Sequence, residues 1–384
     1  MVRAVNCDRS AQGCRTVSCM GGCGTGSAIP CQSQHWGNTD GRTVFQGLGA
    51  WLMRDRLPTR ALVVLDIGHG NAAVLLTPEG VGIIDAGPGP ALIKLLNELE
   101  VREIDWLLLS HADQDHIGGA VALLADGRFR VHRLRANPDS TKRTVAWDDL
   151  IYEADANEGV DFQPGLTPGS AHDYRLGDIS VEVLSPSAYL VSKGAGGRDR
   201  ENRRIVTNSL SAVVRVIGAG NRVLLPGDLD RVGLDDALRH QVDLSCDTLV
   251  WPHHGSNPGS KGDSFVSDLC SAVRPAFVVF SIGRNKFENP RPELVRDLRR
   301  QLGSQVRIAC TQLSRNCAQT LGTSDLGHLS AVFSLGRISG EACAGSIVVD
   351  LDSGCIFPDS AAHRSFIERS VPMALCFKKW GTDS

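Results

Sequence analysis

Residues 110–119 read Ser-His-Ala-Asp-Gln-Asp-His-Ile-Gly-Gly, and they follow the largely apolar run 104–109, Ile-Asp-Trp-Leu-Leu-Leu. This run predicts a buried β-strand that ends at residue 109. The strand end then presents two imidazoles and two carboxylates, which belong to His111, Asp113, Asp115 and His116. Alternating His and Asp side chains at a strand end are typical of a metal site that keeps coordination positions open for water or substrate.

A polar surface loop is the alternative interpretation, but four further fragments repeat the pattern. Each fragment lies where a short apolar run stops or begins and presents a polar side chain there. The fragments contain Asp85, Asn208 with Ser209, Asp228, and the pair His253–His254. Five such fragments in one chain, with His and Asp repeated, indicate strand ends that converge on metal.

Composition places the chain among ordinary globular proteins. The 384 residues are 42% hydrophobic and 22% charged, enough for one large α/β domain or two smaller ones. The net charge of −3 does not indicate a nucleic-acid-binding protein, although local basic patches stay open. We find no apolar run of about 18 residues and no signal-peptide pattern, so we expect a soluble, cytoplasmic protein that does not bind membranes. The 12 cysteines are then expected to be thiols or metal ligands.

Three regions follow from the distribution of apolar residues. Residues 1–52 are rich in Gly, Ser, Thr and Cys, and we expect a disordered leader, with Met53 as a candidate true start. Residues 53–320 alternate short apolar runs with helical patterns, which predicts two packed sheets with helices outside. Residues 321–384 are expected to form a Cys-containing C-terminal extension with a strand at 329–335.

The set of motifs resembles the metallo-β-lactamase superfamily, and within it the hydrolase domain of ComEC-type DNA-uptake (competence) proteins. The resemblance implies an α/β fold, the αββα four-layer sandwich, over a hydrolase domain at 53–320. Besides 110–119, it rests on 65–72 (Leu-Asp-Ile-Gly-His-Gly-Asn-Ala), 84–87 (Ile-Asp-Ala-Gly), 226–228 (Pro-Gly-Asp), 252–256 (Pro-His-His-Gly-Ser), 281–285 (Ser-Ile-Gly-Arg-Asn) and 289–293 (Asn-Pro-Arg-Pro-Glu).

The resemblance also implies a binuclear centre of two divalent metal ions. Asp228 would bridge the ions, and Asp115, His116 and Asp228 would be the catalytic residues. Asp85 would accept a hydrogen bond from a ligand histidine and fix its tautomer. The ions would hold a hydroxide and clamp the attacked phosphoryl group. The implied ligands are His111, Asp113, Asp115, His116, Asp228 and His254, with His253 as the alternative to His254.

Three positions depart from the patterns that the resemblance brings. Asp113 stands where the superfamily usually has His, so the site is harder and Mn²⁺ competes with Zn²⁺ as the bound ion. Asn208 stands where a third His ligand is common, so we expect a supporting residue there and one loosely held ion. Asn289 stands where ComEC-type proteins tend to carry His. The residues expected to contact substrate are Ser256, Arg284, Asn285 and Asn289.

Four late cysteines form a second candidate site. Cys310, Cys317, Cys343 and Cys376 could bind a structural Zn²⁺ that fastens the C-terminal extension. Their spacing is irregular, so buried free thiols are the alternative.

We expect a metal-dependent phosphodiesterase whose substrate is nucleic acid. A nuclease needs Lys and Arg beside the metals, and the candidates are Arg284 and the basic run 198–204, which could equally be a solvated loop. His69 either lines the mouth of the site or is a turn residue without a chemical role. Two alternatives stay open. One is a small-molecule hydrolase acting on a lactone, thioester or cyclic nucleotide, and the other is a catalytically weak sensor or scaffold component of a bacterial defence system.

Overall fold

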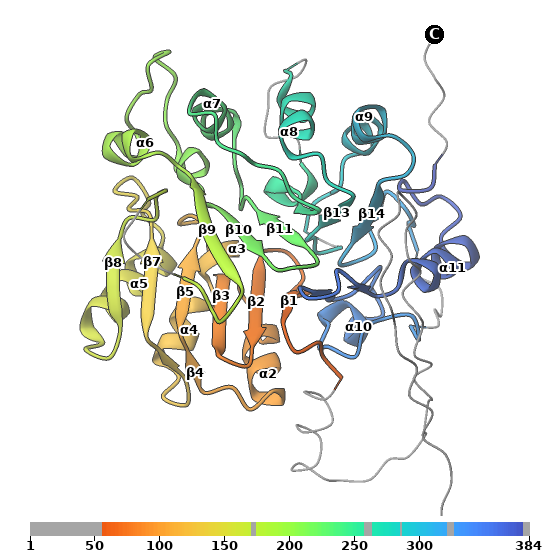
Figure 1. Ribbon diagram of the computed structural model, residues 1–384, viewed down its shortest axis with the longest axis horizontal. Coiled ribbons are helices and arrows are strands. Elements are labelled where there is room, and N and C mark those ends of the chain that lie inside the picture. The colour runs from red at the N-terminus through yellow and green to blue at the C-terminus, as the bar shows by residue number, and fades with distance from the viewer. Residues whose placement is uncertain (1–55, 170–173, 257–262, 285, 321–325, 379–384) are drawn as a thin grey trace, which may run out of the picture. The chain divides into compact units, whose positions relative to one another are not determined.

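The computed structural model describes residues 56–169, 174–256, 263–284, 286–320 and 326–378 (Figure 1). By its internal contacts the chain divides into two units, Met1–Gly37 and Asn38–Ser384, and the described residues all belong to the second unit. The disorder expected for 1–52 and the substrate contact expected for Asn285 therefore lie outside the described residues.

The first sheet has eight strands in the order β16-β15-β1-β2-β3-β5-β7-β8. Neighbouring strands are antiparallel from β16 to β3 and parallel from β3 to β8. The carboxyl ends of β3 and β5 consequently meet at one edge of the sheet, where parallel strands commonly place functional residues. The strands are β1 (Ala61–Val64), β2 (Ala72–Thr77), β3 (Gly80–Ala86), β5 (Trp106–Leu109), β7 (Arg133–Ala136), β8 (Asp161–Pro164), β15 (Ile347–Asp350) and β16 (Ile356–Phe357).

The second sheet has six strands in the order β14-β13-β12-β11-β10-β9. Strands β9, β10 and β11 are antiparallel, whereas β11 to β14 run parallel. A separate pair consists of β4 (Glu103–Ile104) and β6 (Arg130–Val131). The six strands are β9 (Ser180–Ser185), β10 (Val213–Ile217), β11 (Arg222–Leu225), β12 (Thr248–Val250), β13 (Phe277–Phe280) and β14 (Arg307–Cys310).

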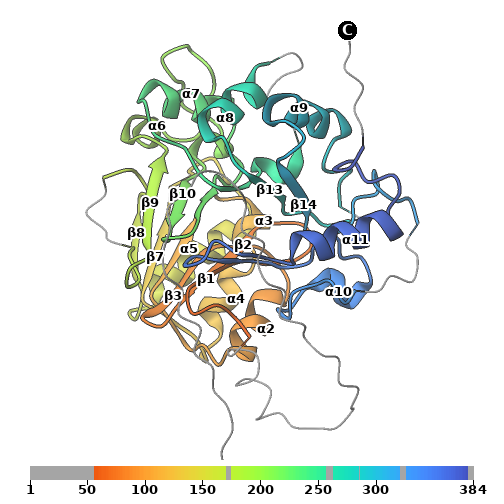
Figure 2. The same ribbon diagram turned by 45° about the vertical axis from the view of Figure 1, so that its right-hand side comes forward.

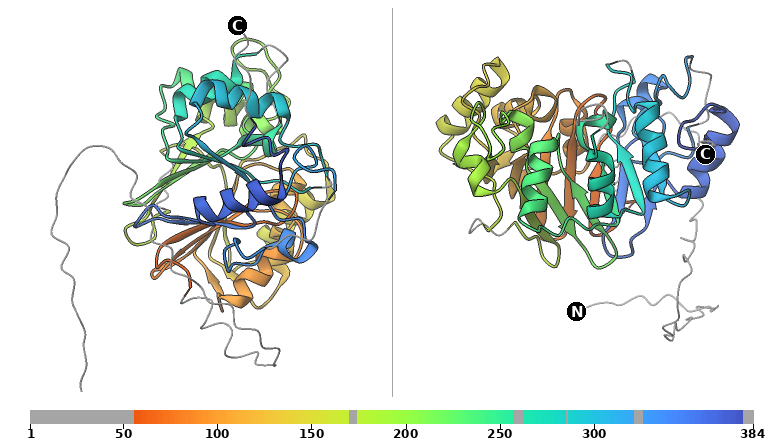
Figure 3. Two further views of the ribbon diagram at one scale, coloured as in Figure 1. Left: turned by 90° about the vertical axis from the view of Figure 1, so that its right-hand side faces the viewer. Right: turned by 90° about the horizontal axis from the view of Figure 1, so that it is seen from above.

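Helices cover the outer faces of both sheets, which gives four layers (Figure 3). The first sheet is covered by α2 (Ala91–Glu98), α4 (Ala120–Ala125) and α5 (Val145–Ala156). The second is covered by α7 (Arg231–Arg239), α8 (Phe265–Val273) and α9 (Pro292–Leu302), with α11 (Ser360–Ser370) beside β14 (Figure 2). The short segments are α3 (Gln114–Ile117), α6 (Ala188–Lys193), α10 (Leu335–Ser339) and the 3-10 turns η1 (Thr207–Leu210) and η2 (Pro252–Gly255).

Strand β1 illustrates how one apolar run serves two cores. Its side chains alternate between the two faces of the sheet. Leu62 packs with Val214 of the second sheet in the core between the sheets. Val63 points the other way and packs with Leu95 of α2. All four residues of β1 are buried, which is why the strand has no polar alternation in its sequence. The layers confirm the predicted αββα sandwich.

The strand predicted at 329–335 is wrong. Only Ser334 makes a bridge, to Asp66, and the chain then enters α10. Ser334 caps this helix, because its Oγ accepts a hydrogen bond from the backbone of Arg337, and Gly340, at φ 71°, ends it. A short helix, with Ser334 as its N-cap and Gly340 as its C-cap, therefore begins within the predicted strand and replaces its end.

The boundary predicted at residue 320 does not divide the fold. Strand β15 pairs with β1 in antiparallel register, with Val348 opposite Val63. Strands β15 and β16 of the region predicted to be an extension thus complete the first sheet, α11 packs with the core of the second sheet, and the region belongs to the same compact unit. None of the described helices is long and apolar enough to cross a membrane.

Candidate metal centre

Strand ends from both sheets place the predicted ligands together. Asp85 lies near the end of β3, and the loop after β5 carries His111 and Asp113. Helix α3 begins directly after this loop and holds Asp115 and His116. From the second sheet, Asp228 follows β11, and the turn η2 after β12 carries His253 and His254. The centre therefore lies where the two sheets meet.

The carboxylate of Asp228 faces two groups of ligands. Its Oδ1 lies 3.1 Å from Nε2 of His116 and 3.5 Å from Nε2 of His254. Its Oδ2 lies 3.4 Å from Nδ1 of His253 and 3.8 Å from Nε2 of His111. We call His111, Asp113 and His253 the first half-site, and Asp115, His116 and His254 the second half-site. The geometry gives each half-site one oxygen of Asp228.

The second half-site is the more compact of the two. Nε2 of His254 lies 3.3 Å from Oδ2 of Asp115 and 3.3 Å from Nε2 of His116. His69, left open by the sequence, joins it with Nε2 3.0 Å from the same Asp115 oxygen. The ring of His69 also contacts Phe287, which is 53% exposed. His69, Asp115 and His254 are thus spaced as metal ligands, as are His111, His116 and Asp228.

The first half-site contains a cation that the sequence did not predict. Oδ2 of Asp113 lies 3.4 Å from Nε2 of His111, and its Oδ1 forms an ion pair with Lys142. Asn208 Nδ2 lies 3.2 Å from Nδ1 of His253, so Asn208 supports this ring. No local pattern around Lys142 indicates the contact, because it arises only when the loop before α5 folds over the strand end.

Hydrogen bonds on the far side of two rings aim their Nε2 atoms at the centre. Nδ1 of His116 lies 2.7 Å from Oδ2 of Asp85, whose other oxygen accepts the backbone N–H of Ser110 at 2.7 Å. Nδ1 of His254 lies 3.0 Å from the carbonyl oxygen of Ser281. A donor role for Nδ1 leaves the Nε2 lone pair free to bind metal.

Backbone conformation at the centre is unusual for residues with side chains. His253 and His254 both have φ of 53°, and Asp85 has φ of 58°. The left-handed region costs residues other than Gly about 1–3 kcal/mol and is concentrated at functional sites. Gly283 approaches the turn of His69 so closely that a Cβ there would lie 2.4 Å from the His69 nitrogen. The chain therefore accepts strain to bring these segments together.

Burial and charge set the protonation of the ligands. Burial lowers the pKa of His111 to about 4, so its ring is neutral near pH 7 and able to bind metal. Burial also opposes a charge on His116, but the carboxylates of Asp228 and Asp85 outweigh it and raise the pKa well above its usual value. Burial would raise the pKa of Asp228, yet the imidazoles of His116 and His254 outweigh it and lower the pKa. The centre thus holds charged carboxylates that favour a cation.

Two buried ligand atoms of the centre lack hydrogen-bond partners and are therefore available to a metal ion. Nε2 of His111 and Oδ1 of Asp228 are buried and have no hydrogen-bond partner among the described residues. Buried polar atoms rarely lack partners. Imidazole nitrogen and carboxylate oxygen are donors for Zn²⁺ and Mn²⁺, so the residues present fit divalent cations at these atoms.

The described residues that were predicted to contact substrate have polar groups engaged within the protein or are buried. Arg284 is buried, and its Nη1 and Nη2 donate hydrogen bonds to the carbonyl oxygens of Leu313 at 2.6 Å and Ala318 at 2.7 Å. These donors of Arg284 hold a loop of the protein itself, and its contact with substrate stays a prediction. Ser256 uses its Oγ to close the η2 turn on the carbonyl oxygen of His253, and Asn289 is buried.

The fold and the His and Asp groups are those of a candidate metal-dependent hydrolase, and comparison with known proteins shows which family the chain is similar to. Residues 65–254 match the family model described as "Metallo-beta-lactamase superfamily". This part of the chain is therefore similar to that superfamily, and it contains the His and Asp groups that are spaced as metal ligands.

The curated relatives are longer than the part that this chain matches. The chain is 29% identical over 259 residues to ComE operon protein 3 of Bacillus subtilis (strain 168), covering 62% of this chain and 30% of that protein. It is 28% identical over 242 residues to Competence protein ComA of Neisseria gonorrhoeae, covering 60% and 28%. The match thus spans less than a third of each relative. The crystal structure of the metallo-beta-lactamase fold protein YhfI from Bacillus subtilis is 11% identical, with a TM-score of 0.42 over 65% of this chain and 96% of that one.

Proposed function

We propose that the protein is a two-metal phosphodiesterase that acts on nucleic acid. The observation that carries the proposal is the carboxylate of Asp228, whose Oδ1 lies nearest to His116 and His254 and whose Oδ2 lies nearest to His253 and His111. When bound, two divalent ions at such a centre supply an activated water and neutralise charge on the attacked phosphoryl group.

The protein's own residues hold and orient this centre. His111, Asp113 and His253 would hold one ion, and Asp115, His116 and His254 the other, with Asp228 between them. Asp85 keeps the ring of His116 in the tautomer that presents Nε2. The ammonium of Lys142 lies at the first half-site, where it offers a positive charge to an anionic substrate.

The donor set leaves Zn²⁺ and Mn²⁺ as candidate ions. Three carboxylates, Asp113, Asp115 and Asp228, stand among the ligands, which makes the site harder than one built from imidazoles alone. Asp113, in the place of an imidazole, favours Mn²⁺ in the first half-site.

Nucleic acid as substrate is supported by the relatives rather than by a basic groove. The similar proteins carry the names Competence protein ComA and, for one from Haemophilus influenzae, Recombination protein 2. Within the basic run 198–204, Arg203 is engaged by carboxylates of the protein itself, because it pairs with Asp199 at 2.7 Å and with Asp235 of α7 at 2.5 Å. We therefore propose that the substrate is bound at the metals and Lys142 and not along that run.

The test is cleavage of end-labelled single-stranded DNA by the full chain with added Mn²⁺ or Zn²⁺. We expect cleavage by the natural protein and by Asp126→Ala, which removes a carboxylate paired with Arg128 after α4. We expect background rates for Asp228→Ala. Equal cleavage by Asp228→Ala would assign the activity to a contaminant. No cleavage by protein that holds two ions would contradict the nuclease and favour a lactone, thioester or cyclic nucleotide as substrate.

A further inference from the structure

The aromatic ring of Phe287 lies exposed beside the second half-site. Its centroid lies 4.7 Å from that of the His69 ring, and Nε2 of His69 in turn lies 3.0 Å from Oδ2 of Asp115. The two ring planes meet at 61°, an edge-to-face contact that occupies at most one face of the Phe287 ring. Single exposed apolar side chains are common on protein surfaces, so it is the position of this one, one residue away from a candidate metal ligand, that is informative.

The turn that carries Phe287 is held in place on both sides. Before it, the buried Arg284 is bonded to carbonyl oxygens of the segment after β14. After it, Nδ2 of Asn316, from the same segment, donates to the carbonyl oxygens of Glu288 at 3.0 Å and Pro290 at 3.2 Å. The ring is therefore presented by a braced turn, and a ligand that stacks on it has little chain to order.

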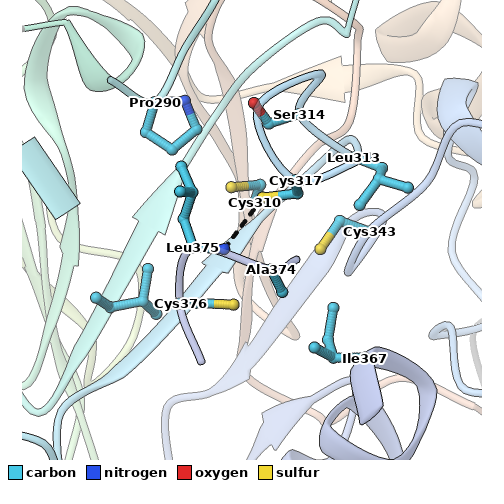
Figure 4. Close-up of a pocket in the computed structure, with 11 residues that line it drawn as sticks. Pro290, Cys310, Leu313, Ser314, Cys317, Cys343, Ile367, Ala374, Leu375 and Cys376 are labelled. Atoms are coloured by element: carbon cyan, nitrogen blue, oxygen red, sulfur yellow. Dashed lines mark hydrogen bonds between the residues drawn. The ribbon is translucent and has the colours of Figure 1, made fainter. Parts of the chain in front are cut away.

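Pro290 fixes the end of this turn in the apolar core. It is buried and lines an apolar cavity beside β14 with side chains such as Leu313 (Figure 4). The same cavity is lined by four cysteines, Cys310, Cys317, Cys343 and Cys376. Burial raises the pKa of each of these thiols, so they are neutral near pH 7, and they are not among the described groups that are spaced as metal ligands. The cavity walls thus pack the end of the turn without adding charge.

Two lysines place positive charge near the ring and the centre. Lys286 is exposed and precedes Phe287 in the same turn. Lys142 pairs with Asp113 at the first half-site, whereas Phe287 contacts His69 at the second. A phosphate bound between the half-sites would therefore have a cation toward one side and an aromatic ring toward the other. Proteins that bind single strands combine these groups, because cations follow the phosphates and aromatic rings stack on the bases.

We propose that Phe287 is a stacking platform for one unpaired base of a single-stranded nucleic acid whose phosphate is bound at the histidine–aspartate centre. The inference rests on the proposed function and specifies its substrate. A base inside a duplex has both faces covered by its neighbours, so only an unstacked base offers a face to the ring. Every base has such a face, so the platform selects single strands without selecting a sequence.

The first test measures binding of a fluorescent single-stranded phosphorothioate oligonucleotide, which resists hydrolysis, to the full chain with Mn²⁺. We expect Phe287→Ala to weaken binding about 10–100-fold, and Phe287→Trp to retain it, because an indole ring also stacks on bases. The matched control is Tyr152→Ala, which removes an exposed aromatic ring on α5 and should leave the affinity unchanged. Equal affinity of the natural protein and Phe287→Ala, or no binding by either, overturns the proposal.

A second test separates stacking from a change in the shape of the site. An oligonucleotide of the same length built from abasic nucleotides has the phosphates but no bases. We expect the natural protein and Phe287→Ala to bind it equally, because no base is left to stack on the ring. A loss of affinity in Phe287→Ala that is as large for the abasic strand as for the normal strand overturns the proposal. Displacement of the normal strand by an equal concentration of cyclic AMP would assign the ring to a small nucleotide and would also overturn it.

Cleavage decides the proposed function separately from these binding measurements. Single-strand binding that depends on Phe287, without cleavage, contradicts hydrolysis and leaves the stacking platform in place. Single-strand cleavage with the same KM in the natural protein and Phe287→Ala supports hydrolysis and contradicts the platform alone.

Discussion

His253 and His254 are adjacent residues with the same left-handed φ, yet their rings meet different oxygens of Asp228. If the backbone were extended, the two adjacent side chains would point to opposite faces of a strand. The tight turn of η2 keeps both rings at one edge of the sheet, and Gly255, at φ 80°, continues the turn where a Cβ would meet Phe280. Two residues in one turn thereby serve two half-sites.

At the scale of single residues, Asp85 should control metal affinity without touching metal. In Asp85→Asn, the amide N–H₂ would face Nδ1 of His116 and favour the tautomer that carries the proton on Nε2. We expect metal affinity to fall about 10–100-fold, as measured by competition with a chelating dye. The control is Asp105→Asn, whose carboxylate accepts the N–H of Val81 away from the centre. Equal affinity in the two variants would contradict the orienting role.

Lys142 should compete with metal for Asp113. Because its ammonium pairs with that carboxylate, Lys142→Met frees a ligand and removes a repelling charge. We expect the first half-site to bind Mn²⁺ more tightly by about tenfold, equivalent to ~1.4 kcal/mol. Titration calorimetry would measure this. Lys94→Met, on α2, serves as the control, and unchanged Mn²⁺ affinity in Lys142→Met would show that the ion pair does not oppose metal.

At the scale of elements, one buried carboxylate joins three segments. Asp66 follows β1 and accepts hydrogen bonds from Gln312 Nε2 at 2.9 Å, Ser334 Oγ at 2.6 Å and the N–H of Gly336 at 2.7 Å. It thus ties the first sheet to the segment after β14 and to the start of α10. The side chain of Asp66 is fully buried, so these donors would have no solvent acceptor if the carboxylate were removed.

Asp66→Ala should therefore destabilise the protein strongly. We expect a loss of about 3 kcal/mol or more in the free energy of unfolding, from the stranded donors, measured by urea denaturation. Burial raises the pKa of Asp66, so the folded chain binds its proton more readily than the unfolded chain. The group's stabilising contribution is full below its unfolded pKa and decreases as pH rises through the raised folded pKa. The difference in the free energy of unfolding between the natural protein and Asp66→Ala should be larger at pH 5 than at pH 8. A larger difference at pH 8 would contradict the raised pKa of Asp66.

Sequence patterns predicted the site best where a ligand residue lies close in the chain to the strand end that positions it. The ligands His111 and Asp228 each stand within a few residues of the strand end that positions them, so local apolar runs and turns indicated their place. The carbonyl oxygens that Arg284 meets could not be predicted, because they belong to residues about 30 positions further along the chain. Lys142 gave no signal at all, since its partner belongs to a distant loop.

At the scale of the whole described fold, residues beyond 320 supply two strands of the first sheet and a helix that packs with the second sheet. Truncation after residue 320 removes β15, β16 and α11, which exposes the backbone of β1 and an apolar face of the second sheet. We expect the truncated chain to lose the folded state, measured by circular dichroism and size-exclusion chromatography. Truncation after Lys378 is the control and should leave a folded monomer or assembly unchanged. A folded product that ends at residue 320 would restore the predicted boundary.

The pairing of β1 with β15 also sets an order of events during synthesis. Ala61 lies opposite Asp350, so the ribosome must add nearly 290 residues after β1 emerges before its partner exists. At about 5–20 residues per second, the gap is about 15–60 s. Throughout that time an entirely apolar strand has one side unpaired, exposed to other nascent chains. The first sheet is therefore completed after most of the chain is made, and chaperone binding to β1 would protect the protein during its most vulnerable period.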